Sequence, residues 1–291
     1  MTGMKSDYMR PLGAEVPQQA ADSVQTADGR KSYAFEINGL THVFDRGTEH
    51  EFKIFDNFSM RVEDRPGVSE VVSVMGGSGC GKSCLLRMAA GLMAPQSGDI
   101  RILGRHIDEY KSVPMVFQNY SSFEWMTVLD NVALPMVLKG MGRDDAREAA
   151  MDTIRLVGLE EHAGKYAKSS VLSGGQLQRV SIARCLTSGS PVFFLDEATG
   201  ALDIRMKREI QDLIVKIASE TEHTIINVTH SPEEALYISS RIFVLEPGPC
   251  RIFREMEISY PQGMRDRRIF DTAEYREYSR ELTRVLDEVC R

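Results

Sequence analysis

Two kinds of hydrophobic pattern alternate along this chain and predict its strands and helices. Residues 33–38 alternate between apolar and polar side chains, as in a strand with one buried face, and residues 52–62 indicate further strands at an antiparallel edge. Mainly apolar runs of strand length occupy residues 71–75, 113–117, 192–195, 224–228 and 242–245. We predict that the last three are parallel core strands, because strands buried on both faces lack the alternation.

Helical spacing appears in three parts of the chain. Glycines follow the run at 71–75, and then a helical pattern begins with the apolar members Cys84, Leu85, Met88, Ala89 and Leu92. Residues 125–188 are mostly helical, and a helix over 143–157 is predicted to end at Gly158. The apolar face of that helix is expected to hold Ala146, Ala149, Ala150, Ile154 and Val157. A last helix is marked by Tyr275, Tyr278, Leu282, Val285, Leu286 and Val289.

This order predicts an α/β core that is interrupted by a helical insert. The core is expected over residues 31–118 and 189–248, and the helical subdomain over 119–188. A C-terminal extension follows at 249–291, where the terminal helix either covers its own domain or has a regulatory or dimer-stabilising role. Residues 1–30 are rich in Gln, Ala, Asp and Ser and are predicted to be a mobile arm.

The charge balance narrows the classes of partner. The chain has a formal net charge of -7, so a broad basic surface for nucleic acid is not expected. The one dense basic run, over residues 265–268, is predicted to be a solvated face. No run approaches the roughly 20 apolar residues of a membrane-spanning helix. The start of the chain has no apolar signal core, which predicts a cytoplasmic protein with reduced cysteines.

A glycine-rich loop joins the strand at 71–75 to the following helix. It consists of Gly76, Gly77, Ser78, Gly79, Cys80, Gly81, Lys82 and Ser83. This is the P-loop pattern in its expected context, in which backbone N–H groups and a helix N-terminus surround phosphates. Lys82 is expected to supply charge to the outer phosphates, and Ser83 a hydroxyl to Mg²⁺. The fold expected is therefore a P-loop NTPase with a mixed, mainly parallel sheet and an antiparallel β edge.

Polar residues also follow the other predicted strands. Asp196 and Glu197 end the strand at 192–195, where Asp196 would hold Mg²⁺ and Glu197 would polarise the attacking water. Gln118 and His230 follow the strands at 113–117 and 224–228. Ligands of open α/β sheets bind at these carboxyl ends, although a lone Gln or His in such a loop is more often structural.

A second phosphate-binding surface is predicted at residues 172–176, Leu-Ser-Gly-Gly-Gln, which lead into an apolar helix. One polypeptide cannot easily fold this surface and the P-loop onto the same nucleotide. The economical interpretation is that each chain lends the element to the nucleotide of a partner chain. The working unit would then be a dimer.

With these motifs in this order, the chain resembles the nucleotide-binding subunits of ABC transporters from about residue 32 to 245. The resemblance implies that Glu197, His230 and Gln118 are catalytic, with His230 contacting the γ-phosphate. It implies magnesium contacts from Ser83, Gln118 and Asp196. It also implies ATP contacts from the P-loop, from Cys84, and across the dimer from Ser173, Gly174, Gly175 and Gln176. Phe44 resembles the aromatic that stacks on adenine, with ordinary core packing as the alternative.

The chain departs from the usual family pattern at two positions, and it also resembles one branch of the family. Cys84 stands where the family usually has Thr, a stronger hydrogen-bond donor, and Gly77 stands where Pro is frequent. Several short motifs, including residues 200–203 and 229–235, are similar to the importers of nitrate, sulfonates and taurine. The implied partners are membrane permease subunits, a second ATPase subunit and, indirectly, a solute-binding protein, at the cytoplasmic face of the membrane. An exporter or lipid-transport ATPase, and a soluble ATPase acting on nucleic acid or ribosomes, are the alternatives.

Overall fold

The computed structural model describes residues 32–64, 69–110 and 113–289. Its central sheet has the strand order β10-β9-β3-β8-β7-β6. Five of these strands are parallel, namely β3 (Glu70–Gly76), β6 (Met115–Val116), β7 (Val192–Asp196), β8 (Thr224–Val228) and β9 (Arg241–Glu246). The predicted mixed, mainly parallel sheet is confirmed. The predicted arm at 1–30 lies outside the described residues.

Antiparallel strands border this sheet in two places. A separate four-stranded sheet pairs β2 (Phe52–Glu63), β1 (Tyr33–Phe44), β4 (Ser97–Ile102) and β5 (Arg105–His106). In the central sheet, β10 (Arg251–Glu257) pairs antiparallel to β9. The sequence patterns missed β4, β5 and β10, and residues 52–62 belong to one strand.

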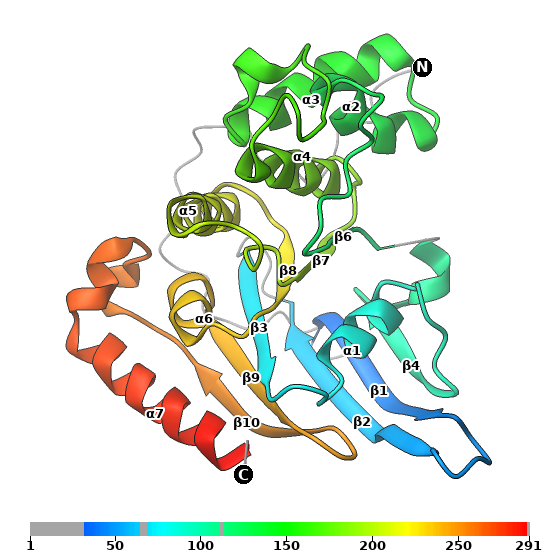
Figure 1. Ribbon diagram of the computed structural model, residues 1–291, viewed down its shortest axis with the longest axis vertical. Helices are drawn as coiled ribbons and strands as arrows, with labels where there is room; N and C mark the ends of the chain where they lie inside the picture. The colour runs from blue at the N-terminus through cyan, green and yellow to red at the C-terminus, as the bar shows by residue number, and fades with distance from the viewer. Residues whose placement is uncertain (1–31, 65–68, 111–112, 290–291) are drawn as a thin grey trace.

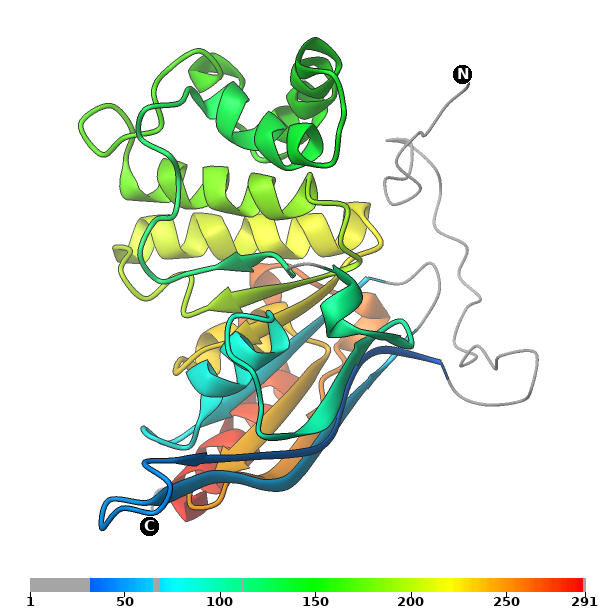
Figure 2. The same cartoon turned by 90° about the vertical axis from the view of Figure 1, so that its right-hand side faces the viewer.

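The helices divide into groups that Figure 1 places around the central sheet. Helices α2 (Val128–Leu138), α3 (Arg143–Leu156) and α4 (Gly174–Leu186) lie together at one end. Helix α5 (Ile204–Glu220) runs beside α4, as Figure 2 also shows. The remaining helices are α1 (Lys82–Ala89), α6 (Pro232–Ile238) and α7 (Ala273–Val289), of which α7 packs on α6 and β9.

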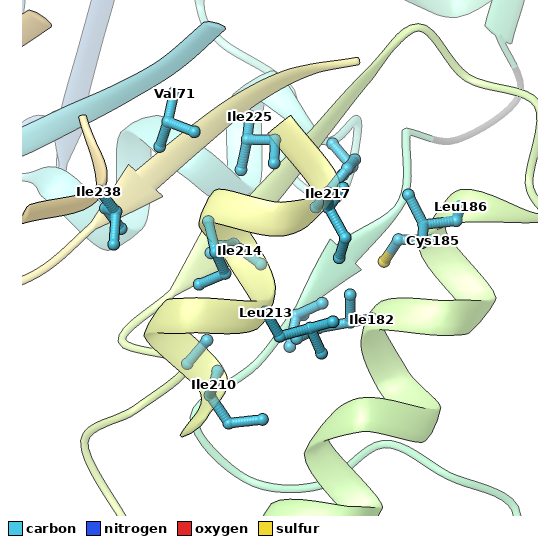
Figure 3. Close-up of a cluster of buried hydrophobic side chains, with 14 of the residues drawn as sticks. Val71, Ile182, Cys185, Leu186, Ile210, Leu213, Ile214, Ile217, Ile225 and Ile238 are labelled. Atoms are coloured by element: carbon cyan, nitrogen blue, oxygen red, sulfur yellow. The ribbon is translucent and has the colours of Figure 1, made fainter. Parts of the chain in front are cut away.

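Helix α5 joins the helical group to the central sheet through its apolar face. Ile210, Leu213, Ile214 and Ile217 are buried on this face. Figure 3 shows them between Ile182 of α4 on one side and the strand residues Val71 and Ile225 on the other. Because burial of each such side chain is worth about 1.5–3 kcal/mol, this layer holds α4 in a fixed relation to the strand ends.

Three details of the sequence interpretation were wrong. Leu92 is 58% exposed, because the helix ends before Gly91, whose φ of 73° is incompatible with continuation. Ala149 is exposed on α3, where alanine is tolerated for its helix propensity. The basic run at 265–268 is not simply solvated, because Arg265 donates to the carbonyl oxygens of Ser239 (2.8 Å) and Ile258 (3.0 Å).

Candidate active site

The loop between β3 and α1 has a backbone that only glycine supports at key positions. Gly76, Gly79 and Gly81 have φ values of 151°, 78° and 99°. A Cβ at Gly76 would lie 2.4 Å from the carbonyl oxygen of Leu245, which no side chain can tolerate. The Lys82 ammonium lies against this loop and donates to the carbonyl oxygens of Gly76 and Gly77, each at 2.9 Å. The loop is thus a rigid cradle with one cation at its mouth.

Asp196 lies at the carboxyl end of β7 and is hydrogen bonded to the hydroxyl of Ser83 at the start of α1. Burial, followed by the charge of the adjacent Glu197, raises the pKa of Asp196. Arg87 and Lys82 compensate the Asp196 charge only in part, since its pKa is still raised. A half-buried carboxylate beside a hydroxyl fits a hard cation such as Mg²⁺, which takes one or two protein oxygens and completes its shell with phosphate and water. Among the described residues no group of three or more His, Cys, Asp or Glu side chains is placed to hold a metal ion.

Glu197 and His230 meet between the ends of neighbouring strands β7 and β8. The Glu197 Oε1 atom lies 2.5 Å from Nε2 of His230. Glu197 has a φ of 50°, an uncommon conformation for a side-chain-bearing residue, and its N–H donates to the carbonyl oxygen of Val228 at 3.0 Å. Strain of this kind costs about 1–3 kcal/mol and concentrates at functional sites. The positive φ of Glu197 turns its carboxylate toward His230.

Gln118 reaches the same loop from the end of β6. Its Nε2 atom would lie 3.4 Å from a Cβ placed on Gly200, three residues after Glu197. A residue that the sequence analysis missed supports this approach. Gln178 of α4 is fully buried and donates to the carbonyl oxygens of Phe117 (3.3 Å) and Ala198 (2.7 Å). The sequence signal for Gln178 was a polar residue among the mainly apolar positions of its helix face.

The second predicted phosphate surface is the N-terminus of α4. Ser173 is its N-cap, with a capping box in which the Ser173 hydroxyl accepts from the Gln176 N–H and Gln176 Oε1 accepts from the Ser173 N–H. Gln176 also contacts Nε2 of His162 at 2.9 Å. The Gly175 N–H points to the sulfur of Met206 at 3.2 Å. The capping box already satisfies the N–H groups of Ser173 and Gln176. The helix dipole still favours an anion at this turn.

Phe44 ends β1 and is half-buried. Its ring packs edge-on against His42, with centroids 4.8 Å apart, and rests on the core cluster beneath the antiparallel sheet. The structure therefore shows the packing contact of Phe44, and its adenine contact stays a prediction.

Comparison with known proteins decides the family. The ABC transporter family model matches residues 56–200. The chain is 37% identical over 227 residues to the taurine import ATP-binding protein TauB of Roseobacter denitrificans, covering 77% of this chain and 82% of TauB. The chain belongs to the ABC transporter ATP-binding proteins.

Other members of the family agree with this assignment. The bicarbonate transport ATP-binding protein CmpD of Synechococcus elongatus is 36% identical over 228 residues, or 77% of this chain and 80% of CmpD. The dimeric post-hydrolysis structure of the ATP-binding cassette MJ0796, bound to ADP and Pi, superposes with a TM-score of 0.65. It is 30% identical and covers 78% of this chain and 99% of that cassette. This ABC protein is an ATPase with the P-loop fold described above.

Proposed function

We propose that this chain is the ATPase subunit of an importer for a small solute, with the import direction and solute class indicated by its taurine and bicarbonate relatives. The single observation that carries the ATPase part of the proposal is the convergence of Lys82, Ser83, Asp196, Glu197 and His230 at one end of the central sheet. This set can bind a triphosphate and activate water, as phosphoryl transfer requires.

Each residue of the site then has a defined task. The P-loop and Lys82 bind the phosphates of ATP, while Ser83, Asp196 and Gln118 would hold Mg²⁺, which neutralises the charge on the transferred phosphoryl group. Glu197 accepts a proton from the attacking water, and His230 orients Glu197 through their 2.5 Å contact. Ser173 and the glycines after it bind the nucleotide of the second subunit in a dimer.

ATP is proposed to close the dimer, and the helical subdomain is proposed to transmit this closure to the membrane subunits. A groove of about 460 Å³ lies between α2, α4 and the end of β6. Its lining includes Phe117, Phe123, Leu134 and Leu138, and Leu138 is 78% exposed. No helix among the described residues is long and apolar enough to cross a membrane. We assign the groove to a cytoplasmic segment of the permease, because Phe117 precedes Gln118 directly and the groove therefore adjoins the site.

Leu138→Glu is expected to weaken permease binding about tenfold or more, because a charge would be desolvated in an apolar contact. ATP binding by the isolated chain should not change, since Leu138 ends α2 and is not part of the P-loop. Phe253→Glu is the matched control, because Phe253 is 41% exposed on β10. The measurement is recovery of the membrane subunit with the tagged chain from detergent-solubilised membranes. Equal recovery with both variants would contradict the assignment of the groove.

The same purification tests the function as a whole. A membrane subunit should be recovered with the chain, and a solute-binding protein with its solute should stimulate ATP hydrolysis by the complex. Recovery with DNA or ribosomes in place of a membrane subunit would overturn the proposal. A complex that hydrolyses ATP without any effect of a solute-binding protein would favour an exporter or lipid transporter.

Cys84 offers a further test of nucleotide binding. Burial raises the pKa of its thiol, so the group is neutral and a weak donor. Cys84→Thr is expected to tighten ATP binding by roughly two- to tenfold, the net worth of one ordinary hydrogen bond. Cys84→Ala should leave affinity close to that of the unaltered chain. Calorimetric titration with ATP measures both, and a threonine variant no tighter than the alanine variant would refute the contact.

A further inference from the structure

Glu234 is a fully buried carboxylate outside the residues assigned above. It lies in the first turn of α6, four residues after His230. A buried carboxylate is costly unless hydrogen bonds or cations compensate it. The compensating groups are the Thr199 hydroxyl, Gln211 Nε2 at 3.1 Å, Asn227 Nδ2 at 3.4 Å and Lys207 Nζ at 3.6 Å.

These donors come from the segments that carry the hydrolysis residues. Thr199 is two residues after Glu197, and it is buried with 3% exposure. Asn227 lies in β8, the strand that leads to His230. The other two donors are on α5. Glu234 therefore ties the loop of Glu197, the loop of His230 and α5 to one anchor.

The C-terminal extension enters this network through Arg267. Its guanidinium donates to Gln211 Oε1 at 3.2 Å and to Asp212 Oδ1 at 3.0 Å. It also stacks on the Tyr237 ring at 4.1 Å from the centroid, and the Tyr237 hydroxyl donates to Asp212 at 2.6 Å. The guanidinium is thus held on three sides by α5 and α6.

The side-chain amide of Gln211 can link Arg267 to Glu234 in one orientation. Arginine only donates hydrogen bonds and a carboxylate only accepts them, whereas an amide does both. The Gln211 oxygen accepts from Arg267 while its nitrogen donates to Glu234. Arg267 therefore fixes the amide in the orientation that serves Glu234.

We propose that Arg267 is a positioning residue for ATP hydrolysis, acting through Gln211 and Glu234 on the loops of Glu197 and His230. The inference rests on the proposed function of those two residues. A displaced or altered C-terminal extension would release Gln211 and loosen Glu234, and the contact between Glu197 and His230 would lose its support. Asn227 also donates to the Ser73 hydroxyl of β3 at 3.2 Å, but none of the hydrogen bonds to the Glu234 carboxylate in the part of the chain that the structure describes comes from the P-loop, so ATP binding would be retained.

The test is steady-state ATPase kinetics of the full chain. Arg267→Met is expected to lower kcat about tenfold, as for a misplaced catalytic group, with KM for ATP within about twofold of the unaltered value. Gln211→Met should produce the same loss with the C-terminal extension intact. The double variant should lose no more than either single variant, because both break one chain of contacts.

Two controls separate positioning from general packing. Arg268→Ala removes an exposed arginine whose side chain pairs with Asp266, and Arg265→Met removes contacts that pack the same extension without touching Gln211. Neither should lower kcat, and thermal unfolding confirms that each variant is folded. Additive losses, or an equal loss in Arg265→Met, would overturn the proposal. An inactive unaltered chain would instead refute the proposed function of the site itself.

Discussion

Glu197→Gln is expected to reduce ATP turnover by about 10²–10⁴-fold, the contribution of a positioned general base. The amide keeps the shape of the carboxylate but cannot accept the proton of the attacking water. It should leave ATP binding intact, since the P-loop and Lys82 are formed by β3 and α1. Phosphate release measures turnover, and retention of labelled ATP by the same protein measures binding.

The matched control for this change is Glu233→Gln. Glu233 is an exposed carboxylate three residues after His230 and makes no contact with Glu197 among those the structure describes. The control variant should hydrolyse ATP at the unaltered rate. Undiminished turnover by Glu197→Gln would remove Glu197 from its role as the base, and the contact with His230 would then need another explanation.

The parts of the fold that could be predicted are those in which sequence pattern and burial coincide. The runs that became β7, β8 and β9 are mainly apolar and do not alternate, because both faces of those strands are covered. The sequence pattern did not predict strand β10, because β10 is an edge strand in which Met256 is the one buried residue. Its pattern of Arg and Glu resembles a loop until a neighbouring strand is placed beside it.

The site shows the same division. The P-loop glycines lie within one short loop, and Asp196 and Glu197 are neighbours at the end of β7. The geometry within each of these two groups is therefore local and could be predicted. Arg267 and Gln211 are separated by 56 residues, and only the packing of the C-terminal extension brings them together. A charge run predicts solvation on average, but the long apolar stem of arginine can cross a core while its head finds partners.

Gly174→Ala is the second change with a large expected effect. Gly174 follows the capping residue Ser173, and an added Cβ would lie 2.2 Å from the hydroxyl oxygen of Tyr120 and 3.0 Å from the ring carbon that bears it. Tyr120 lies two residues after Gln118. The clash must displace either the Tyr120 ring, which is 38% exposed, or the start of α4. A displacement of about 1 Å at a catalytic constellation costs roughly 10²-fold in rate, so ATPase activity should fall by up to about that factor if α4 moves.

A suppressor tests this geometry directly. Tyr120→Phe removes the hydroxyl oxygen, the atom nearest to the added Cβ. The double variant should hydrolyse ATP about tenfold faster than Gly174→Ala alone. Recovery is incomplete because the ring carbon stays 3.0 Å from the Cβ. Gly164→Ala is the matched control, because no atom lies within 4 Å of a Cβ at that position. ATP binding by the isolated chain should be unaffected in all three proteins. Full activity of Gly174→Ala, or a double variant no better than the single one, would show that the start of α4 does not depend on this contact.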